Sequence, residues 1–379
     1  MVFDWTEEQL MLREMLRNFT KNEVAPRDKW MDENGFDREL HQKMVDAGIY
    51  DITIPEEYGG AGFDFVTGTM AIHELAKGSA SAALILDCFG FGCDILIRYG
   101  TEEQKKKYFA LARQGHRIGF ALTESTAGSD ATAIRSTATP VEGGGWILNG
   151  EKAWITNMEA EHSIIFAKTD PTLGAKGISA FIVSRDAEGF HVGSHEDKMG
   201  LRGTTTGDMS FDNVYLPPDA LLGKVGEGFR IAMSALDGAR ISISAVATGL
   251  AYHAMDLARI YANERVAFKQ PIAALGGIQS KFADMSARIR AMELMVYDAA
   301  LMKDRDIYNT VEAAQTKLLC STWATQIALE AMQIMGGNGC SREYHVERFV
   351  RDAKMLEVAE GTTEILKISI GRNILAQKK

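Results

Sequence analysis

The chain has 379 residues, of which 46% are hydrophobic and 24% are charged, as in globular proteins with a large core. This length favours two or three domains over a single one. The 41 Lys and Arg residues against 51 Asp and Glu residues give a net charge of −10. That balance argues against nucleic acid as a partner, because binding to a phosphate backbone depends on clustered Lys and Arg.

The cysteines and the N-terminal segment further limit the kind of protein that this chain can be. Cys88, Cys93, Cys320 and Cys340 form no Cys-x-x-Cys pair, so neither a metal site nor a disulfide framework is expected. The N-terminal segment is charged and has helical spacing, unlike an apolar leader. We find no run of about 18 apolar residues, so no membrane span is expected. These features predict a cytoplasmic protein.

Residues 1–120 have the pattern of a helical domain. "WTEEQLMLREMLRNFTKNEV" opens with Thr6 and Gln9 at the spacing of a capping box and continues with apolar residues at helical spacing. "GTEEQKKKYFALA" has Thr101 and Gln104 at the same capping-box spacing. We therefore predict helices that begin directly after these threonines.

Residues 121–235 change to short segments rich in β-branched and aromatic residues, separated by Gly, Asn, Asp or Pro. This pattern is typical of an antiparallel β domain. In "EKAWITN", Trp154 and Thr156 are two residues apart, so on a strand they face the same side. The pair forms either a flat wall for a planar cofactor or part of an ordinary sheet core.

Residues 236–379 return to helical spacing. Three segments there, at 231–268, 278–304 and 310–335, each exceed twenty residues, a length suited to a helical bundle. "GGNG" at 336–339 follows the last of them instead of a strand, so it is no dinucleotide fingerprint. It forms either a tight turn or a helix end that admits a phosphate.

Acidic residues in unusual settings are the candidates for chemistry. Asp87 and Asp94 lie seven residues apart in the apolar run "SAALILDCFGFGCDILI" and share one helix face. Burying an Asp side chain there costs free energy unless it is paired with a cation, protonated or in contact with water. Each aspartate therefore either lines a pocket or forms a salt bridge. Glu360, in "EGTTEI", precedes a glycine and two threonines. It is either a capping residue at a helix start or a working acid/base.

Several motifs together resemble the flavin-dependent acyl-CoA dehydrogenases over essentially the whole chain. "ALTESTAGSD" at 121–130 is similar to the first family signature, with Ser125 and Thr126 in place of Pro-Gly. "QIMGGNGCSREYHVERFVRDAK" at 333–354 resembles the second, with Cys340 in place of an aromatic residue. "ERVAFKQPI" is similar to an R-x-x-F-G-x-P segment with Lys269 in place of Gly, and "EGTTEI" matches the segment that carries the catalytic base.

The resemblance implies a multidomain α+β fold. A helical N-terminal domain (1–120), a central antiparallel β domain (121–235) and a C-terminal four-helix bundle (236–379) are expected, assembled as a homotetramer with FAD as cofactor. Some FAD contacts are expected from the adjacent subunit, namely those of Arg265, Phe268, Gln333 and Gly337. Within one subunit the implied FAD-binding residues are Ala121, Leu122, Thr123, Ser129, Trp154, Thr156 and Thr362.

The resemblance also implies a reaction, α,β-dehydrogenation of an acyl-CoA thioester. Glu360 removes the α-proton and the β-hydride passes to flavin N5, so base and flavin must lie on opposite sides of the acyl chain. Ala239 occupies the alternative base position of some relatives and cannot act as one. Electron-transfer flavoprotein is the implied electron acceptor. The implied substrate-binding residues are Asp87, Ser129, Asp237, Arg240, Ala359 and Gly361.

Two departures from the family bear on the acyl group. Ala359 stands where a Tyr usually precedes the base, which leaves space beside the α-carbon for a bulky group. Asp87 aligns with the wall of the acyl pocket, where it serves as a second acid/base, bonds a polar group, or is a neutral wall residue. We predict an alicyclic substrate such as cyclohexanecarboxyl-CoA or cyclohex-1-enecarboxyl-CoA. The alternatives are a short linear or branched acyl-CoA, or a relative that works in the reductase direction.

Overall fold

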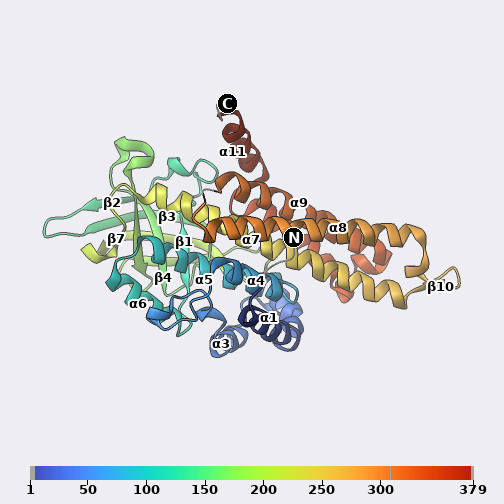
Figure 1. Ribbon diagram of the computed structural model, residues 1–379. Coiled ribbons are helices and arrows are strands. Elements are labelled where there is room, and N and C mark those ends of the chain that lie inside the picture. The colour runs from blue at the N-terminus through green and yellow to red at the C-terminus, as the bar shows by residue number, and fades with distance from the viewer. Residues whose placement is uncertain (1–4, 308, 377–379) are drawn as a thin grey trace.

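The computed structural model describes residues 5–307 and 309–376, which form helices, then a sheet, then long helices (Figure 1). The N-terminal helices are α1 (Glu7–Phe19), α2 (Asp28–Asn34), α3 (Arg38–Asp46), α4 (Phe65–Ala76), α5 (Ala80–Tyr99) and α6 (Glu102–Ala112). Both predicted capping boxes are present, with Thr6 capping α1 and Thr101 capping α6. The predicted helical texture of this part of the chain is therefore confirmed.

The central part of the chain forms an eight-stranded sheet. Its strands are β1 (Ile118–Ala121), β2 (Thr137–Pro140), β3 (Trp146–Thr156), β4 (His162–Lys168), β5 (Ile178–Ser184), β6 (Phe190–His195), β7 (Thr206–Leu216) and β8 (Leu221–Leu222). They run in the order β6-β7-β3-β2-β4-β5-β8, with β1 paired to β4.

The sheet departs from the predicted antiparallel arrangement at two pairs. Strands β1 and β2 both pair with β4 in parallel. The chain reaches β4 from each of them through a longer connection that contains other elements, so a parallel pairing is possible where residue types between the segments indicated antiparallel neighbours. The β domain is otherwise antiparallel, as predicted.

The C-terminal part contains α7 (Gly228–Glu264), α8 (Gly276–Asp304), α9 (Thr310–Met335), α10 (Val346–Val358) and α11 (Thr363–Ala376). The predicted first long helix is too long at its C-terminal end: α7 stops at Glu264, and Val266–Ala267 (β9) pairs with Gln270–Pro271 (β10) in a hairpin. Positive φ angles at Phe268 and Lys269 form its turn. This hairpin projects from the far end of the bundle (Figure 1).

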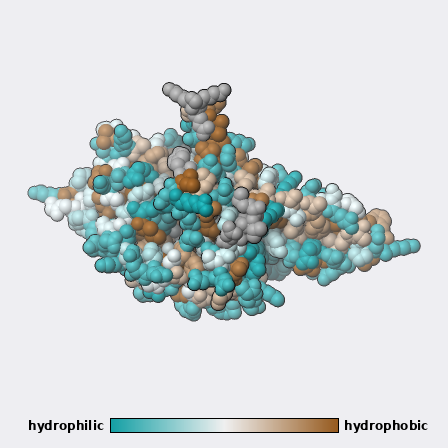
Figure 2. Space-filling model, in the orientation of Figure 1, coloured by the Kyte–Doolittle hydropathy of each residue, from teal (hydrophilic) through white to brown (hydrophobic). Residues whose placement is uncertain are grey.

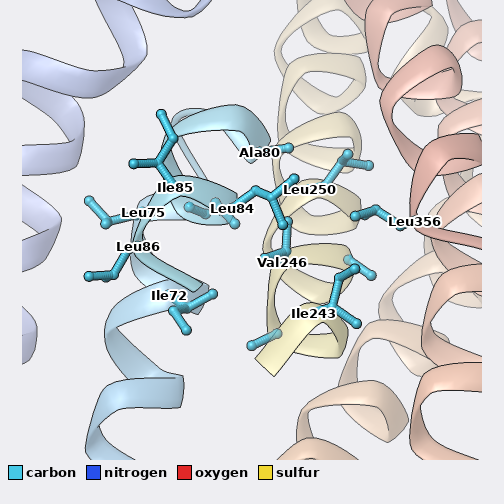
Figure 3. Packing of buried hydrophobic residues seen from close by; sticks show 14 of the residues in the cluster. Ile72, Leu75, Ala80, Leu84, Ile85, Leu86, Ile243, Val246, Leu250 and Leu356 are labelled. Atoms are coloured by element: carbon cyan, nitrogen blue, oxygen red, sulfur yellow. The ribbon is translucent and has the colours of Figure 1, made fainter. Parts of the chain in front are cut away.

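Helix α7 is the centre of the helical packing. All residues from 241 to 251 are buried, so the helix has no solvent-facing side over these turns. Figure 3 shows Ile243, Val246 and Leu250 between the residues of α4 and α5 on one side and Leu356 of α10 on the other. One continuous core therefore joins the N-terminal helices to the C-terminal bundle.

One helix bears on the prediction that no segment spans a membrane. Among the described residues, α5 is long and apolar enough to cross a bilayer by length and composition. However, 72% of its most apolar window is buried inside the protein. Its hydrophobicity is accounted for by packing against α4 and α7.

Helix α11 projects away from the rest of the molecule (Figure 1), and brown hydrophobic atoms lie along the projection (Figure 2). Leu366 is its only buried residue, whereas Ile368, Ile374 and Leu375 are exposed. The predicted domain boundaries at 120/121 and 235/236 stay predictions, and residues 1–4 and 377–379 of the outer two zones lie outside the described residues.

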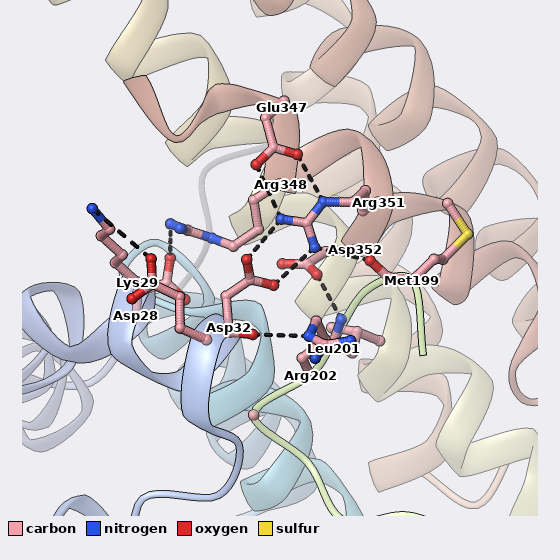
Figure 4. A network of polar contacts seen from close by, with 12 residues as sticks. Asp28, Lys29, Asp32, Met199, Leu201, Arg202, Glu347, Arg348, Arg351 and Asp352 are labelled. Carbon is pink, nitrogen blue, oxygen red and sulfur yellow. Dashed lines mark hydrogen bonds and ion pairs between the residues drawn. The ribbon is translucent and has the colours of Figure 1, made fainter. Parts of the chain in front are cut away.

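A polar network joins the three parts of the chain (Figure 4). Arg351 of α10 donates two bonds to Asp32 of α2, at 2.8 and 2.7 Å, and a third to the carbonyl of Met199 at 2.9 Å. Next to it, the Asp352 carboxylate accepts the N–H of Leu201 at 2.6 Å. Helix α10, which leads directly to Glu360, is thus fixed to both the N-terminal helices and the β domain.

We expect Arg351→Met to lower the free energy of unfolding by about 2–4 kcal/mol, since it removes the guanidinium that is directly paired with the part-buried Asp32. Urea unfolding followed by tryptophan fluorescence measures the change. Arg259→Met is the matched control, because the Arg259 and Asp256 side chains are 57% and 39% exposed. Their pair is expected to contribute less than about 1 kcal/mol. Equal effects of the two substitutions would contradict the structural role given to Arg351.

Candidate active site

Glu360 lies in the four-residue connection between α10 and α11, not in a helix. Its φ is 55°, in the left-handed region, and the φ of Gly361 is 105°. Helix α11 starts at Thr363, and the Thr362 hydroxyl accepts the N–H of Ile365 at 3.4 Å. The capping interpretation of Glu360 is therefore wrong, because Thr362 fills that role and Glu360 sits before the helix begins.

The charge state of Glu360 is set by opposing effects. Burial raises the pKa of its carboxyl, and the cations of Arg240 and Lys317 lower it. Arg240 also donates from Nε to the Glu360 carbonyl at 3.3 Å. A carboxyl whose pKa is raised but held in check by two cations is suited to take up and release a proton.

Asp87, on α5, is buried and accepts a hydrogen bond from the Ser242 hydroxyl of α7. Burial raises the pKa of Asp87 to about 8; the Ser242 bond lowers it and the charge of Glu360 raises it. Asp87 and Glu360 are therefore close enough to influence each other. No ion pair among residues 5–307 and 309–376 involves Asp87, so its carboxyl is largely protonated at neutral pH.

Asp94 takes the other of the two predicted alternatives. It forms salt bridges with Arg98 and Lys303, each at 3.0 Å. The two aspartates on one helix face thus have different roles, one paired with bases and one neutral beside a hydroxyl.

A cavity of about 290 Å³ lies between α4, α5 and α7. Asp87, Ser242 and Ala239 line it, together with apolar side chains that include Ile72 and Leu86. Glu360 is not one of the lining residues. The proximity of Glu360 to this cavity follows from its electrostatic effect on Asp87.

Arg240 is held by a neighbour on its own helix. Its Nη1 donates to Asp237 at 2.9 Å, and Asp237 also accepts from the Thr310 hydroxyl at the start of α9. The predicted residues Asp237, Arg240, Ala359 and Gly361 are thereby brought together with Glu360. The basic guanidinium at this place is suited to an anionic ligand group or to the backbone of the loop.

The end of β3 corrects the simple alternation used to place Trp154. The pairing of β3 with β7 shifts between Lys152 and Ile155, and Trp154 itself has a φ of 60°. The Trp154 side chain is 54% exposed. The Thr156 hydroxyl lies 3.5 Å from that of Thr206, and Thr206 accepts a bond from the buried Lys198 at 3.1 Å. The bulge, not regular pleating, turns the indole outward.

The other residues implied for FAD fall in two places. Ala121, Leu122 and Thr123 lie at the end of β1, where the Thr123 carbonyl accepts the N–H of Ala153 at 3.0 Å; Ser129 is exposed on the following loop. Arg265, Phe268, Gln333 and Gly337 are all exposed at the far end of the bundle. The bond of Asn338 to the Tyr261 hydroxyl, at 3.0 Å, joins the two segments there. Figure 1 places this end well away from β3, so one chain does not bring the two sets together.

Three family models match consecutive parts of the chain. They describe the acyl-CoA dehydrogenase N-terminal domain at residues 6–115, the middle domain at 119–214 and the C-terminal domain at 226–375. The chain belongs to the acyl-CoA dehydrogenase family. The predicted fold, a helical domain, a β domain and a helical C-terminal domain, is confirmed by these matches.

Relatives match over nearly the whole length. The chain is 44% identical over 374 residues to an acyl-CoA dehydrogenase of Bacillus subtilis, covering 98% of each chain. It is 40% identical over 378 residues to the short-chain specific acyl-CoA dehydrogenase of Clostridium acetobutylicum, covering 99% of this chain and 100% of the relative.

Solved structures agree with these matches. The butyryl-CoA dehydrogenase of Megasphaera elsdenii has a TM-score of 0.96 and 37% identity, covering 99% of this chain and all of that one. A chain in the structure of the electron-transferring flavoprotein of Acidaminococcus fermentans has a TM-score of 0.96 and 38% identity, with full coverage of both.

Family membership confirms the predicted enzyme class, an FAD-dependent oxidoreductase acting on acyl-CoA. The end of β3 fits a flavin ring by its own chemistry, because the half-exposed Trp154 indole offers a flat apolar face and Thr156 adds a hydroxyl two residues further along the same strand. The predicted alicyclic preference has no support, since the named relatives act on short-chain and butyryl thioesters.

Lys317 was not predicted as a site residue; it is a buried lysine of α9 that contacts the Glu360 loop. One signal was present in the sequence: Lys317 falls at helical spacing between Ala313 and Cys320, on an apolar face. Ser242, the partner of Asp87, gave no such signal, since a serine on a helix is commonplace.

Asp87→Asn is expected to flatten the dependence of stability on pH. In the native protein Asp87 binds a proton up to about pH 8. An unfolded Asp releases it near pH 4, so its contribution to stability is lost as pH rises through this window. Urea unfolding at pH 5 and pH 8 measures the effect. The loss of stability between the two should be smaller in Asp87→Asn by about 1–4 kcal/mol. An unchanged difference would mean that Asp87 is ionised in the native protein.

Proposed function

We propose that this protein catalyses α,β-dehydrogenation of a short-chain acyl-CoA thioester, with Glu360 as the base that removes the α-proton. The observation that carries this proposal is the setting of Glu360. Its carboxyl is half-buried on a left-handed loop, with its pKa raised by burial and limited by Arg240 and Lys317, beside the Asp87 cavity. A thioester α-proton is only weakly acidic, so its removal needs a desolvated carboxylate fixed in place.

The neighbours of Glu360 have defined tasks in this proposal. Arg240, oriented by Asp237, holds the loop and meets the CoA portion of the substrate. The main-chain N–H of Glu360 donates to the thioester oxygen, which stabilises the charge that forms as the proton leaves. Ala359 and Gly361 present no polar side chain beside the α-carbon.

FAD supplies the hydride acceptor for the β-carbon when it is bound. Trp154, Thr156, Ala121, Leu122, Thr123, Ser129 and Thr362 hold it from one subunit. Arg265 and Phe268 belong to the β9–β10 hairpin region, and Gln333 and Gly337 to the end of α9 and the turn after it. The hairpin lies well away from β3 (Figure 1), which supports contact of these residues with the FAD of an adjacent copy. This division supports an oligomer, and we propose the homotetramer.

The partners follow from the comparisons. The structural match to a chain in the electron-transferring flavoprotein structure of Acidaminococcus fermentans supports such a flavoprotein as electron acceptor. The cytoplasmic location stays a prediction from the sequence.

The setting of Asp87 supports a short acyl group. A protonated carboxyl bonded to Ser242 is a polar wall, against which additional methylenes gain little from burial. We therefore propose that Asp87 is a wall residue that limits chain length, not a second base. The names of the relatives, short-chain specific and butyryl-CoA dehydrogenase, support the same substrate class.

Anaerobic mixing of the FAD-loaded protein with acyl-CoA thioesters tests the proposal through bleaching of the flavin absorbance. Butyryl-CoA should bleach the flavin faster than octanoyl-CoA or cyclohexanecarboxyl-CoA. Glu360→Gln should lower the bleaching rate by about 1,000-fold or more while FAD stays bound, because an amide cannot accept the proton.

Three outcomes separate the parts of this account. Fast bleaching by cyclohexanecarboxyl-CoA would favour the alicyclic alternative. Fast bleaching by butyryl-CoA in Glu360→Gln would exclude Glu360 as the base. Loss of bleaching by butyryl-CoA in Asp87→Asn would contradict a wall role for Asp87.

A further inference from the structure

We propose that Lys317 is a positioning residue for the reaction, which fixes the Glu360 loop through main-chain carbonyls on both sides of it. This inference rests on the proposed role of Glu360 as the base. Lys317 comes from the middle of α9, forty residues or more before the groups that it binds.

The contacts of Lys317 are both with carbonyl oxygens. Its Nζ donates to the carbonyl of Glu357 at 2.9 Å and to that of Gly361 at 2.7 Å. Glu357 lies in the last turn of α10, where carbonyls have no partner within the helix. Gly361, with a φ of 105°, is the residue directly after Glu360. A single ammonium group therefore connects the end of the helix to the far side of the base.

Burying the Lys317 ammonium group costs free energy, so favourable interactions must offset that cost. The Lys317 side chain is fully buried, and no ion pair among the described residues of the chain includes it. Burial lowers its pKa to about 8, and the charge of Glu360 raises it. A buried ammonium without a directly paired carboxylate is rare in protein cores. The largest favourable charge that it meets is that of Glu360.

The loop needs an external clamp because its backbone is strained. Glu360 is a non-glycine residue with a positive φ, a conformation that costs about 1 kcal/mol or more. Lys317 and Arg240 together bind the carbonyls of three residues, Glu357, Glu360 and Gly361. Without Lys317 the loop would lose two of these three bonds and relax away from the reacting geometry.

Lys317 also acts on the base through its charge. The charged groups that face Lys317 are Glu360, Arg240 of α7, Glu357 of α10 and Glu364 of α11, and those that face Glu360 are Arg240 and Lys317. Both cations lower the pKa of Glu360. Removing one of them favours the protonated, inactive form of the base, so activity should be lost first at low pH.

The test compares Lys317→Met with Lys354→Met. Lys354 binds the same residue, Glu357, but through its side-chain carboxylate at 2.9 Å and from an exposed position, so it is a matched control. The pH dependence of kcat/KM and of kcat for butyryl-CoA is measured with each FAD-loaded variant. Lys317→Gln is included because it keeps a hydrogen-bond donor of similar reach without the charge, in case the Met variant does not fold.

For Lys317→Met we expect kcat to fall at least tenfold and the acid limb of kcat/KM to move to higher pH by at least half a unit. Lys317→Gln should show the same displacement of the limb with a smaller loss of kcat. Lys354→Met should leave both unchanged. These effects would accompany a normal FAD content and an unaltered native circular dichroism spectrum.

The inference would be overturned if the acid limb of the Lys317 variants stayed in place. A loss of activity that only followed a loss of folded, FAD-loaded enzyme would assign Lys317 a purely structural role. This failure is distinct from failure of the proposed function. In the latter case the unmodified enzyme would not act on any thioester, or Glu360→Gln would remain active.

Discussion

The helical packing depends on one buried helix, α7. It contacts α4, α5, α8, α9 and α10, and over residues 241–251 it exposes nothing to solvent. A helix buried on all sides must use small side chains where neighbours come close, and Ala, Ser and Gly are frequent in this stretch. Arg240 and Ser242 lie at the start of this buried stretch. The packing that joins the domains therefore also sets the positions of these two side chains near Glu360.

Chemistry at Glu360 requires a compromise between burial and charge. Full burial without cations would keep the carboxyl protonated, and exposure would make it a weak base. The structure avoids both extremes. The Glu360 carboxyl is half-buried, two cations from different helices lie near it, and its neighbour Asp87 is neutral. Each of these groups comes from a separate helix, α7, α9 or α5, so the arrangement exists only in the folded protein.

The sequence was sufficient for features that depend on local spacing. The capping boxes at Thr6 and Thr101 and the long helices α8 and α9 follow from residues close together in the chain. It was insufficient where distant segments meet. The parallel pairing of β1 with β4, the bulge at Trp154, and the bonds of Lys317 to carbonyls more than thirty residues away depend on tertiary packing. The resemblance to a family identified an acyl-CoA thioester as the substrate class, but it did not identify the acyl group.

Removal of the α-proton is the task proposed for Glu360, and exchange of that proton tests this task without the rest of the reaction. Acetyl-CoA has an α-carbon and no β-carbon, so it can lose an α-proton but no β-hydride. In D₂O, the FAD-loaded enzyme should exchange the methyl protons of acetyl-CoA for deuterium, as followed by proton NMR, and Glu360→Gln should not. Exchange at the same rate in both proteins would show that another group is the base and would contradict the account.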